Sequence, residues 1–154
     1  MDEQIVAALL DDVRRLMAGQ GTREEKLTAV CRLLQDKVEH YDWVGFYLVD
    51  ETAARRLVLG PFVGDPTNHV AINFGQGICG QAAEIGQTFV VQDVMAEINY
   101  LSCSDSVKAE IVVPIFKDGH IVGELDIDSH TLAPFSAEDR ALLEQICEQV
   151  AESF

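Results

Sequence analysis

Positive charge is scarce in this sequence. Its 154 residues include 11 lysines and arginines against 26 aspartates and glutamates, a formal net charge of −15 at neutral pH. Binding to nucleic acids and to anionic membrane surfaces depends on lysine and arginine side chains that neutralise phosphates. We therefore expect no nucleic acid and no membrane among its partners, and we interpret the acidic surplus as favouring solubility.

Long apolar segments are also missing. No stretch approaches the ~18 consecutive apolar residues of a membrane-spanning helix. Residues 1–16 lack the cationic start and apolar run of a signal peptide. We therefore expect a cytoplasmic protein, in a compartment that keeps thiols reduced. The chain length and the apolar fraction of 48% fit one domain with one core.

The four cysteines contain no C-x-x-C pair. A disulfide framework is not expected in a reducing compartment, and the spacing does not fit a zinc site, so we predict no metal. Two of the cysteines, Cys31 and Cys147, fall in apolar helical stripes. Buried cysteine behaves as a small hydrophobic residue, so we assign these two a structural role.

Hydrophobic periodicity predicts the order of helices and strands. Two amphipathic helices come first, separated by Gly19–Gly21, and the second follows a capping box at Thr22 and Glu25. A last helix follows a second capping box, at Ser136 and Asp139. Strands and one short helix lie between them. The strands are expected at 43–49, 56–59 (closed by Gly60-Pro61), 70–74, 88–91, 110–116 and 120–127, with loops at 62–69 and 92–108 and the short helix at 81–85.

This order predicts an α+β fold with one mainly antiparallel sheet and helices packed on a face. Strict alternation of strands and helices is absent, which argues against a Rossmann fold. We divide the single domain 1–154 into an N-terminal helical pair (1–40), the sheet with its pocket loops (41–135) and a C-terminal helix (136–154).

The other two cysteines have contexts that favour reactivity. Cys79 lies at the expected start of the short helix, where unpaired N–H groups favour a thiolate; the alternative is tight packing between glycines. Cys103 lies in the polar loop 92–108, which can cover a pocket and leave the thiol accessible. The alternative for Cys103 is an incidental loop residue.

Acidic side chains recur on one expected strand. Glu124, Asp126 and Asp128 alternate along it and share one face. A solvated strand face would explain them without a site. Like-charged carboxylates side by side are unfavourable unless a cation, a proton or a ligand ammonium separates them. The ammonium of an amino acid would serve.

The turn of the last hairpin decides whether Glu110 joins these acids. A two-residue turn at Asp118-Gly119 would pair Glu110 with Ile127 and face it away. A three-residue turn that begins at Lys117 would place Glu110 opposite Asp126. Trp43 and Tyr47, four residues apart, also share one strand face, and core packing is their alternative explanation.

Taken together, these segments resemble the free methionine-(R)-sulfoxide reductases, a family of GAF-domain proteins. The resemblance covers nearly the whole chain and includes the 24-residue step from Cys79 to Cys103. The matching segments are Trp43-Val-Gly-Phe-Tyr47-Leu, Leu57-Val-Leu-Gly-Pro-Phe62, Gly75-Gln-Gly-Ile-Cys79-Gly, Cys103 with Glu110-Ile-Val-Val-Pro114, and Gly123-Glu-Leu-Asp126-Ile-Asp128-Ser129.

The resemblance implies a six-stranded antiparallel sheet, a homodimer and reduction of free methionine sulfoxide. It implies that Cys103 is the catalytic thiol and passes through a sulfenic acid, and that Cys79 is a second redox cysteine. A thioredoxin-type reductant would complete the cycle, with no bound cofactor. The other implied site residues are the acids around the substrate, with Glu110 or Asp128 as proton donor, and an aromatic wall: Glu110, Asp126, Asp128, Trp43 and Tyr47.

One position departs from the family pattern. A third cysteine is usual ten residues before Cys79, and His69 stands there instead. Three possibilities remain open for the recycling step: Cys79 resolves the sulfenic acid, an external thiol does so, or the protein only binds its ligand. His69 itself is either an exposed loop residue or a neighbour that tunes a thiolate.

Overall fold

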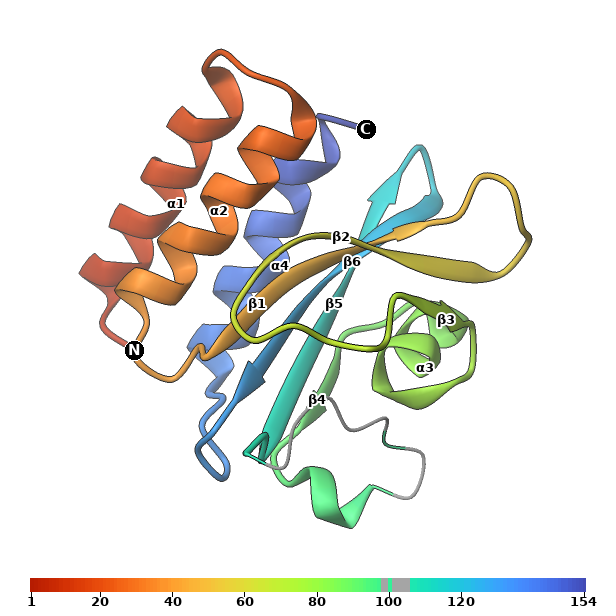
Figure 1. The fold of residues 1–154 in the computed structure, drawn as a ribbon. Coiled ribbons are helices and arrows are strands. Elements are labelled where there is room, and N and C mark those ends of the chain that lie inside the picture. The colour runs from red at the N-terminus through yellow and green to blue at the C-terminus, as the bar shows by residue number, and fades with distance from the viewer. Residues whose placement is uncertain (98–99, 101–105) are drawn as a thin grey trace.

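A computed structural model describes residues 1–97, 100 and 106–154. Figure 1 shows long helices on one side of a twisted sheet and shorter helical segments away from them. The elements are α1 (Glu3–Ala18), α2 (Arg23–Lys37), β1 (Trp43–Val49), β2 (Arg56–Val63), β3 (Ala71–Asn73), α3 (Gly77–Ile85), β4 (Phe89–Val91), the 3₁₀ turn η1 (Val94–Ala96), β5 (Ala109–Lys117), β6 (His120–Ser129) and α4 (Ala137–Ala151).

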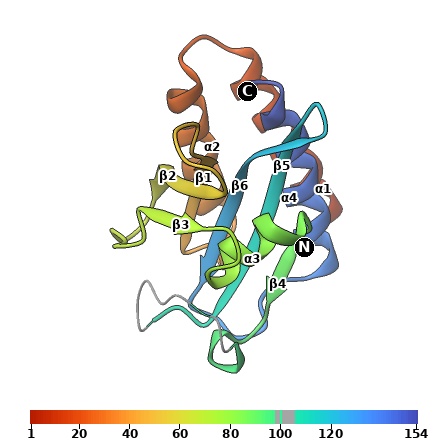
Figure 2. The same cartoon turned by 90° about the vertical axis from the view of Figure 1, so that its right-hand side faces the viewer.

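The six strands form one antiparallel sheet in the order β3-β2-β1-β6-β5-β4. Helices α1, α2 and α4 cover one face, and α3 lies against the opposite face beside β3 and β4 (Figures 1 and 2). The α+β architecture expected from the sequence is therefore confirmed. The short helix α3 covers the second face of the sheet, and the candidate site described below lies on that face.

Both expected capping boxes are present. Thr22 caps α2, and its side chain accepts from the backbone N–H of Glu25 while the Glu25 side chain returns to Thr22. Ser136 and Asp139 make the same reciprocal pair at the start of α4. Each box satisfies N–H groups that have no partner within the helix. The starts of α2 and α4 are therefore confirmed, whereas the short helix α3 begins at Gly77 and not at residue 81 as expected.

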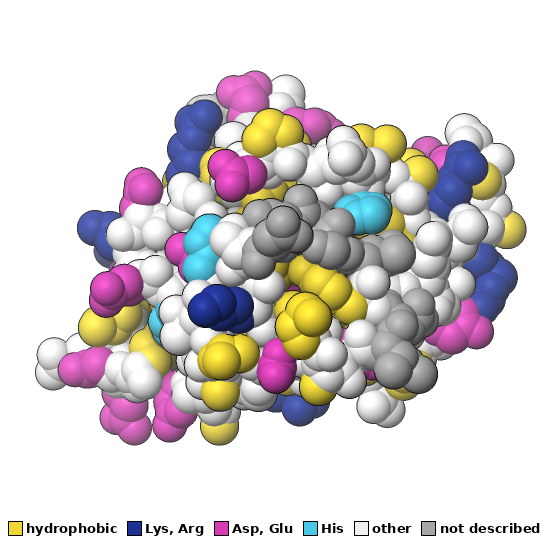
Figure 3. Space-filling model, turned by 60° about the horizontal axis from the view of Figure 1, so that its bottom comes forward, with side chains coloured by type: hydrophobic (Ala, Val, Ile, Leu, Met, Phe, Trp, Pro, Cys, Tyr) yellow, Lys and Arg dark blue, Asp and Glu magenta, His cyan; other side chains and the backbone are white. Residues whose placement is uncertain are grey.

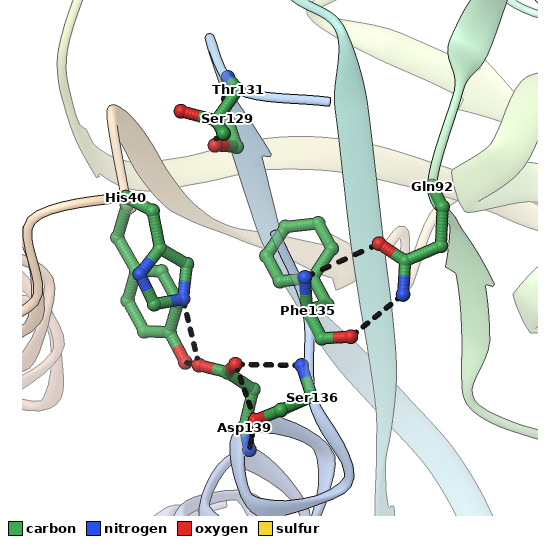
Figure 4. Close-up of polar contacts among 8 residues, drawn as sticks. His40, Gln92, Ser129, Thr131, Phe135, Ser136 and Asp139 are labelled. Carbon is green, nitrogen blue, oxygen red and sulfur yellow. Dashed lines mark hydrogen bonds and ion pairs between the residues drawn. The ribbon is translucent and has the colours of Figure 1, made fainter. Parts of the chain in front are cut away.

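Asp139 also ties the start of α4 to the segment before β1. Tyr41 donates its hydroxyl to Asp139 Oδ1 at 2.5 Å, and His40 Nε2 lies 2.9 Å from the same oxygen. Figure 4 shows His40, Ser136 and Asp139 converging at this junction, with Gln92 bonded to both backbone polar groups of Phe135 nearby. This network joins the N-terminal helical pair to the C-terminal helix.

Strand β2 is longer than the sequence suggested. We expected Gly60-Pro61 to close it after Leu59, but it continues to Val63. The pairing with β1 shifts register between Gly45 and Tyr47, so β2 holds an extra residue at Gly60-Pro61. A bulge accommodates proline, which has no N–H to donate to a neighbouring strand.

The larger apolar core lies between the sheet and helices α1, α2 and α4. Cys31 and Cys147 are buried in it, as expected for structural cysteines. A second cluster, with Trp43 and Tyr47, lies under α3 on the other face. No helix among the described residues is both long and apolar enough to span a bilayer.

Candidate active site

The acidic face of β6 is buried. Glu124, Asp126 and Asp128 are 0%, 3% and 2% exposed, although they alternate with core residues as a solvated strand face would. Helix α3 and the segments around it cover this face of the sheet. The solvated-face interpretation is therefore wrong, because a helix distant in sequence packs over the strand.

Glu110 lies on the same face, in a register that we did not anticipate. It pairs with Asp128 across β5 and β6, and Val112 is the residue opposite Asp126. The turn at Asp118-Gly119 has two residues, but a register shift after Ile115 inserts one extra residue into β6. Both expected pairings of Glu110 are therefore wrong. The extra residue in β6 brings Glu110 to the face of the acids, whereas a two-residue turn without a bulge would direct it to the opposite face.

Cys79, the third residue of α3, points at this cluster. Its Sγ donates to Glu110 Oε2 at 3.7 Å. Ligand atoms of Cys79, Glu110 and Asp126 all lie within 4.8 Å of one another. Three elements, α3, β5 and β6, thus bring a thiol and two carboxyl groups to one point.

The pKa of Cys79 is raised, which is the opposite of the helix-terminus expectation. Burial disfavours the thiolate most, and the negative charges of Asp126, Glu110 and Glu124 disfavour it further. The partial charge of a helix end cannot offset both effects. In the ligand-free protein Cys79 is a neutral thiol, and its S–H group donates a hydrogen bond to Glu110.

Burial also raises the pKa of the acids on β6. It is the first cause for Glu124, Asp126 and Asp128, and the charge of Asp126 adds to the shift of the other two. Buried carboxyl groups that lack compensating cations keep protons to higher pH. The ligand-free cluster therefore carries protons that a bound cation would displace.

Trp43 and Tyr47 stand beside the acids on β1. Trp43 pairs with Asp128, and Tyr47 with Glu124, across the β1–β6 ladder. The Trp43 ring stacks on Phe62, with centroids 5.4 Å apart. Hydrogen bonds fix both polar ends: the indole N–H donates to the Asp65 carbonyl at 2.9 Å, and the Tyr47 hydroxyl donates to the His69 carbonyl at 2.8 Å. The loop between β2 and β3 thus holds the aromatic pair in place.

Two cavities adjoin this face. One, of about 10 Å³, is bounded in part by Cys79, Glu110, Asp126 and His69. It has room for about one water molecule. His69 is half-buried, so the purely exposed-loop interpretation is wrong and this residue adjoins the cluster.

The other cavity, of about 180 Å³, lies between Trp43 and Asp128, with Asp42, Val107 and His130 among its walls.

Figure 3 views the molecule from below. Acidic side chains are spread over this face, and its basic side chains are dispersed and form no continuous patch.

The structure therefore brings together all but one of the expected site residues. Cys103 lies outside the described residues. Glu124 is a further buried acid on this face, and the resemblance assigns it no role. The period-2 pattern contained the signal for it, and only burial distinguishes it from a solvated acid.

Comparisons with known proteins identify the family to which this chain belongs. A model of the GAF domain matches residues 22–154. GAF domain-containing protein A of Dictyostelium discoideum is 38% identical over 138 residues, which are 90% of this chain and 85% of that protein. The free methionine-R-sulfoxide reductase of Escherichia coli is 34% identical over 147 residues, covering 96% of this chain and 87% of that protein.

Among solved structures, the free methionine-R-sulfoxide reductase of Neisseria meningitidis, determined with its substrate, has a TM-score of 0.92 to this chain. It is 35% identical, and the match covers 100% of this chain and 92% of that one. The chain therefore belongs to the GAF domain family and, within it, to the free methionine-R-sulfoxide reductases, a family of oxidoreductases.

Proposed function

We propose that this protein reduces free L-methionine (R)-sulfoxide to L-methionine, with Cys103 as the attacking thiol. The observation that carries the proposal is the convergence of Glu110, Asp126 and Asp128 on one buried face beside Trp43 and Tyr47. The names of the Escherichia coli and Neisseria meningitidis relatives support the same substrate.

The acids explain why an amino acid fits. No described lysine or arginine forms an ion pair with Asp126 or Asp128. A buried carboxylate without a counter-charge is costly, and a substrate ammonium would supply that charge. The substrate enters through the cavity between Trp43 and Asp128, with the Trp43 ring against its methyl-sulfur end.

The chemistry balances with the groups present. The Cys103 sulfur attacks the sulfoxide sulfur, and the oxygen passes to Cys103. A thiol and a sulfoxide thus become a sulfenic acid and a thioether, which is methionine. The proton donor to the departing oxygen is Glu110 or Asp128, and burial raises the pKa of Asp128; the proton of the attacking thiol then restores the donor.

Cys79 is the resolving thiol in this proposal. Cys31 and Cys147 lie in the core on the opposite face of the sheet, so neither can meet a sulfenic acid at this site. Cys79 attacks the Cys103 sulfenic acid, a disulfide forms, and the hydroxyl leaves as water with the Cys79 proton, which passes through Glu110. A thioredoxin-type dithiol in the cytoplasm then reduces the disulfide.

Oxidation of NADPH coupled to thioredoxin and its reductase, with separated sulfoxide epimers, tests the proposal. We expect turnover of the R epimer by the wild type and none by Cys103→Ser. Cys79→Ser should lose multiple turnover but retain one turnover. A wild type that ignores the R epimer contradicts the proposed activity, and unchanged multiple turnover by Cys79→Ser contradicts the resolving role alone.

A further inference from the structure

We propose that Cys79, Glu110 and Asp126 form a binding site for one thiophilic divalent cation of the zinc class. The inference goes beyond the reductase activity, because it concerns the ligand-free protein and requires no sulfoxide. It rests on the positions of the three side chains, the size of the cavity they adjoin and the charge of the acids around it.

The three groups have the spacing of ligands that share one ion. Their donor atoms lie within 4.8 Å of one another, and Cys79 Sγ is 3.7 Å from Glu110 Oε2. Zinc bonds of about 2.3 Å to sulfur and about 2.0 Å to oxygen, in tetrahedral geometry, place sulfur and oxygen ligands about 3.5 Å apart. The observed separation needs only a small adjustment to reach that value.

The cavity beside these atoms matches a single ion. Its volume is about 10 Å³, and Cys79, Glu110 and Asp126 all contribute to its wall. A space of that size holds about one water molecule and excludes an amino acid. His69, which stands where the family pattern has a third cysteine, borders the same cavity.

Glu124 supplies independent evidence that a cation would be stabilised at this position. It is 0% exposed, and neither carboxylate oxygen has a hydrogen-bond partner among the described residues. Asp126 Oδ1 is buried without a partner as well. Buried polar atoms are normally satisfied, and an acid cluster of this kind stabilises a cation placed within it.

The donor set selects the class of ion. Calcium and magnesium take mainly oxygen ligands in shells of six or more, whereas thiolate is a ligand for zinc and other thiophilic ions. Two carboxylates and one thiolate leave a fourth tetrahedral position for water. Binding converts the Cys79 thiol to a metal thiolate and releases its proton to solvent.

Linear spacing gave no sign of this site, and for that reason the sequence led us to expect no metal. Zinc motifs in sequence are recognised by ligands that are close together along the chain. Here the ligands come from α3, β5 and β6, and Glu110 reaches the other two only through the bulge in the last hairpin.

Titration of the reduced wild-type protein with cadmium(II) provides the test, because a thiolate–cadmium bond gives an ultraviolet charge-transfer band. We expect one ion per chain, loss of the band in Cys79→Ser and retention in Cys31→Ser, where the exchanged thiol is buried in the other core. Glu110→Gln and Asp126→Asn should each raise the dissociation constant for zinc(II), measured by calorimetry, at least ~10-fold. Asp118→Asn, an acid-to-amide exchange at the exposed turn, should leave it unchanged.

Three outcomes overturn the proposal: no stoichiometric binding by the wild type, a band that persists in Cys79→Ser, or a band that depends on Cys103 instead. Circular dichroism of each variant shows whether it is folded, so loss of binding cannot be mistaken for unfolding. If the reductase activity is also correct, zinc(II) and methionine sulfoxide exclude each other, and the substrate should raise the apparent dissociation constant for zinc(II). Ion binding without turnover, or turnover without ion binding, separates the two proposals.

Discussion

Glu110 on β5 faces Asp128 on β6 as a direct cross-strand pair. Two acids in this position repel each other if both are ionised. They are tolerated here because burial and the charge of Asp126 raise the pKa of Asp128, so that it holds a proton until a positively charged ligand arrives. The pair therefore connects the fold of the last hairpin to recognition of the ligand.

Removing either acid of the pair should weaken the reaction. A hydrogen bond to a charged group contributes about 1.5–3 kcal/mol, so Glu110→Gln and Asp128→Asn should each lower kcat/KM for the R sulfoxide by at least ~10–150-fold; KM should rise in both variants, and kcat should fall in the one that lacks the proton donor. Steady-state kinetics measures this. Asp118→Asn is the matched control, and equal kinetics for all three variants would refute an ammonium site at this pair.

The aromatic wall depends on a glycine. Gly64 has a φ of +124°, and a Cβ built there would lie 2.6 Å from Trp43 Cδ1. Gly64→Ala should therefore lower the free energy of unfolding by about 2–4 kcal/mol, from backbone strain together with overpacking. Gly119→Ala is the control: its φ is also positive, but nothing lies within 4 Å of the added carbon.

Denaturant unfolding of these two glycine variants separates the contributions. Gly119→Ala should lose only the backbone part, about 1 kcal/mol. If both variants lose the same free energy, the contact with Trp43 does not constrain the loop, and the indole is not held as described.

Much of the fold follows from local sequence, while the site does not. Capping boxes at Thr22 and Ser136 fix the helix starts, because they act within one turn of chain. The face of Glu110 depends on one extra residue in β6, and the extent of β2 depends on a bulge at Pro61. Periodicity predicts a regular ladder and cannot show where a residue is inserted into it.

The burial of the acids was equally hidden from the sequence. Alternation along β6 predicts which side chains share a face, but not whether another element covers that face. Here α3, about forty residues earlier in the chain, covers it. The same contact explains why Cys79 has a raised pKa although it sits at a helix start.

Asp139 should make the stability of the domain depend on pH. Burial alone raises its pKa, but hydrogen bonds from the Ser136 backbone, Tyr41, the Ser136 hydroxyl and His40 outweigh burial and leave the pKa below its usual 3.8. A lowered pKa in the folded state contributes stability at pH values above the unfolded-state pKa. That contribution is lost as the pH falls through the folded-state pKa.

Asp139→Asn removes this contribution. We expect a loss of about 1–3 kcal/mol in the free energy of unfolding at pH 7, and a smaller difference from wild type as the pH falls below the usual value of 3.8. Urea unfolding at several pH values measures both. Glu138→Gln, its exposed neighbour on α4, is the control. A difference that stays constant with pH would show that the charge of the Asp139 carboxylate does not stabilise the contact between α4 and the segment before β1.

In the proposed reaction, oxygen passes from free methionine (R)-sulfoxide to Cys103. A single-turnover reaction without external reductant, analysed by mass spectrometry, tests it most directly. We expect one methionine per chain and a Cys103–Cys79 disulfide in the wild type, and in Cys79→Ser one methionine and a sulfenic acid trapped on Cys103. Methionine formed by Cys103→Ser, or oxidation found at another cysteine with Cys103 unchanged, would contradict it.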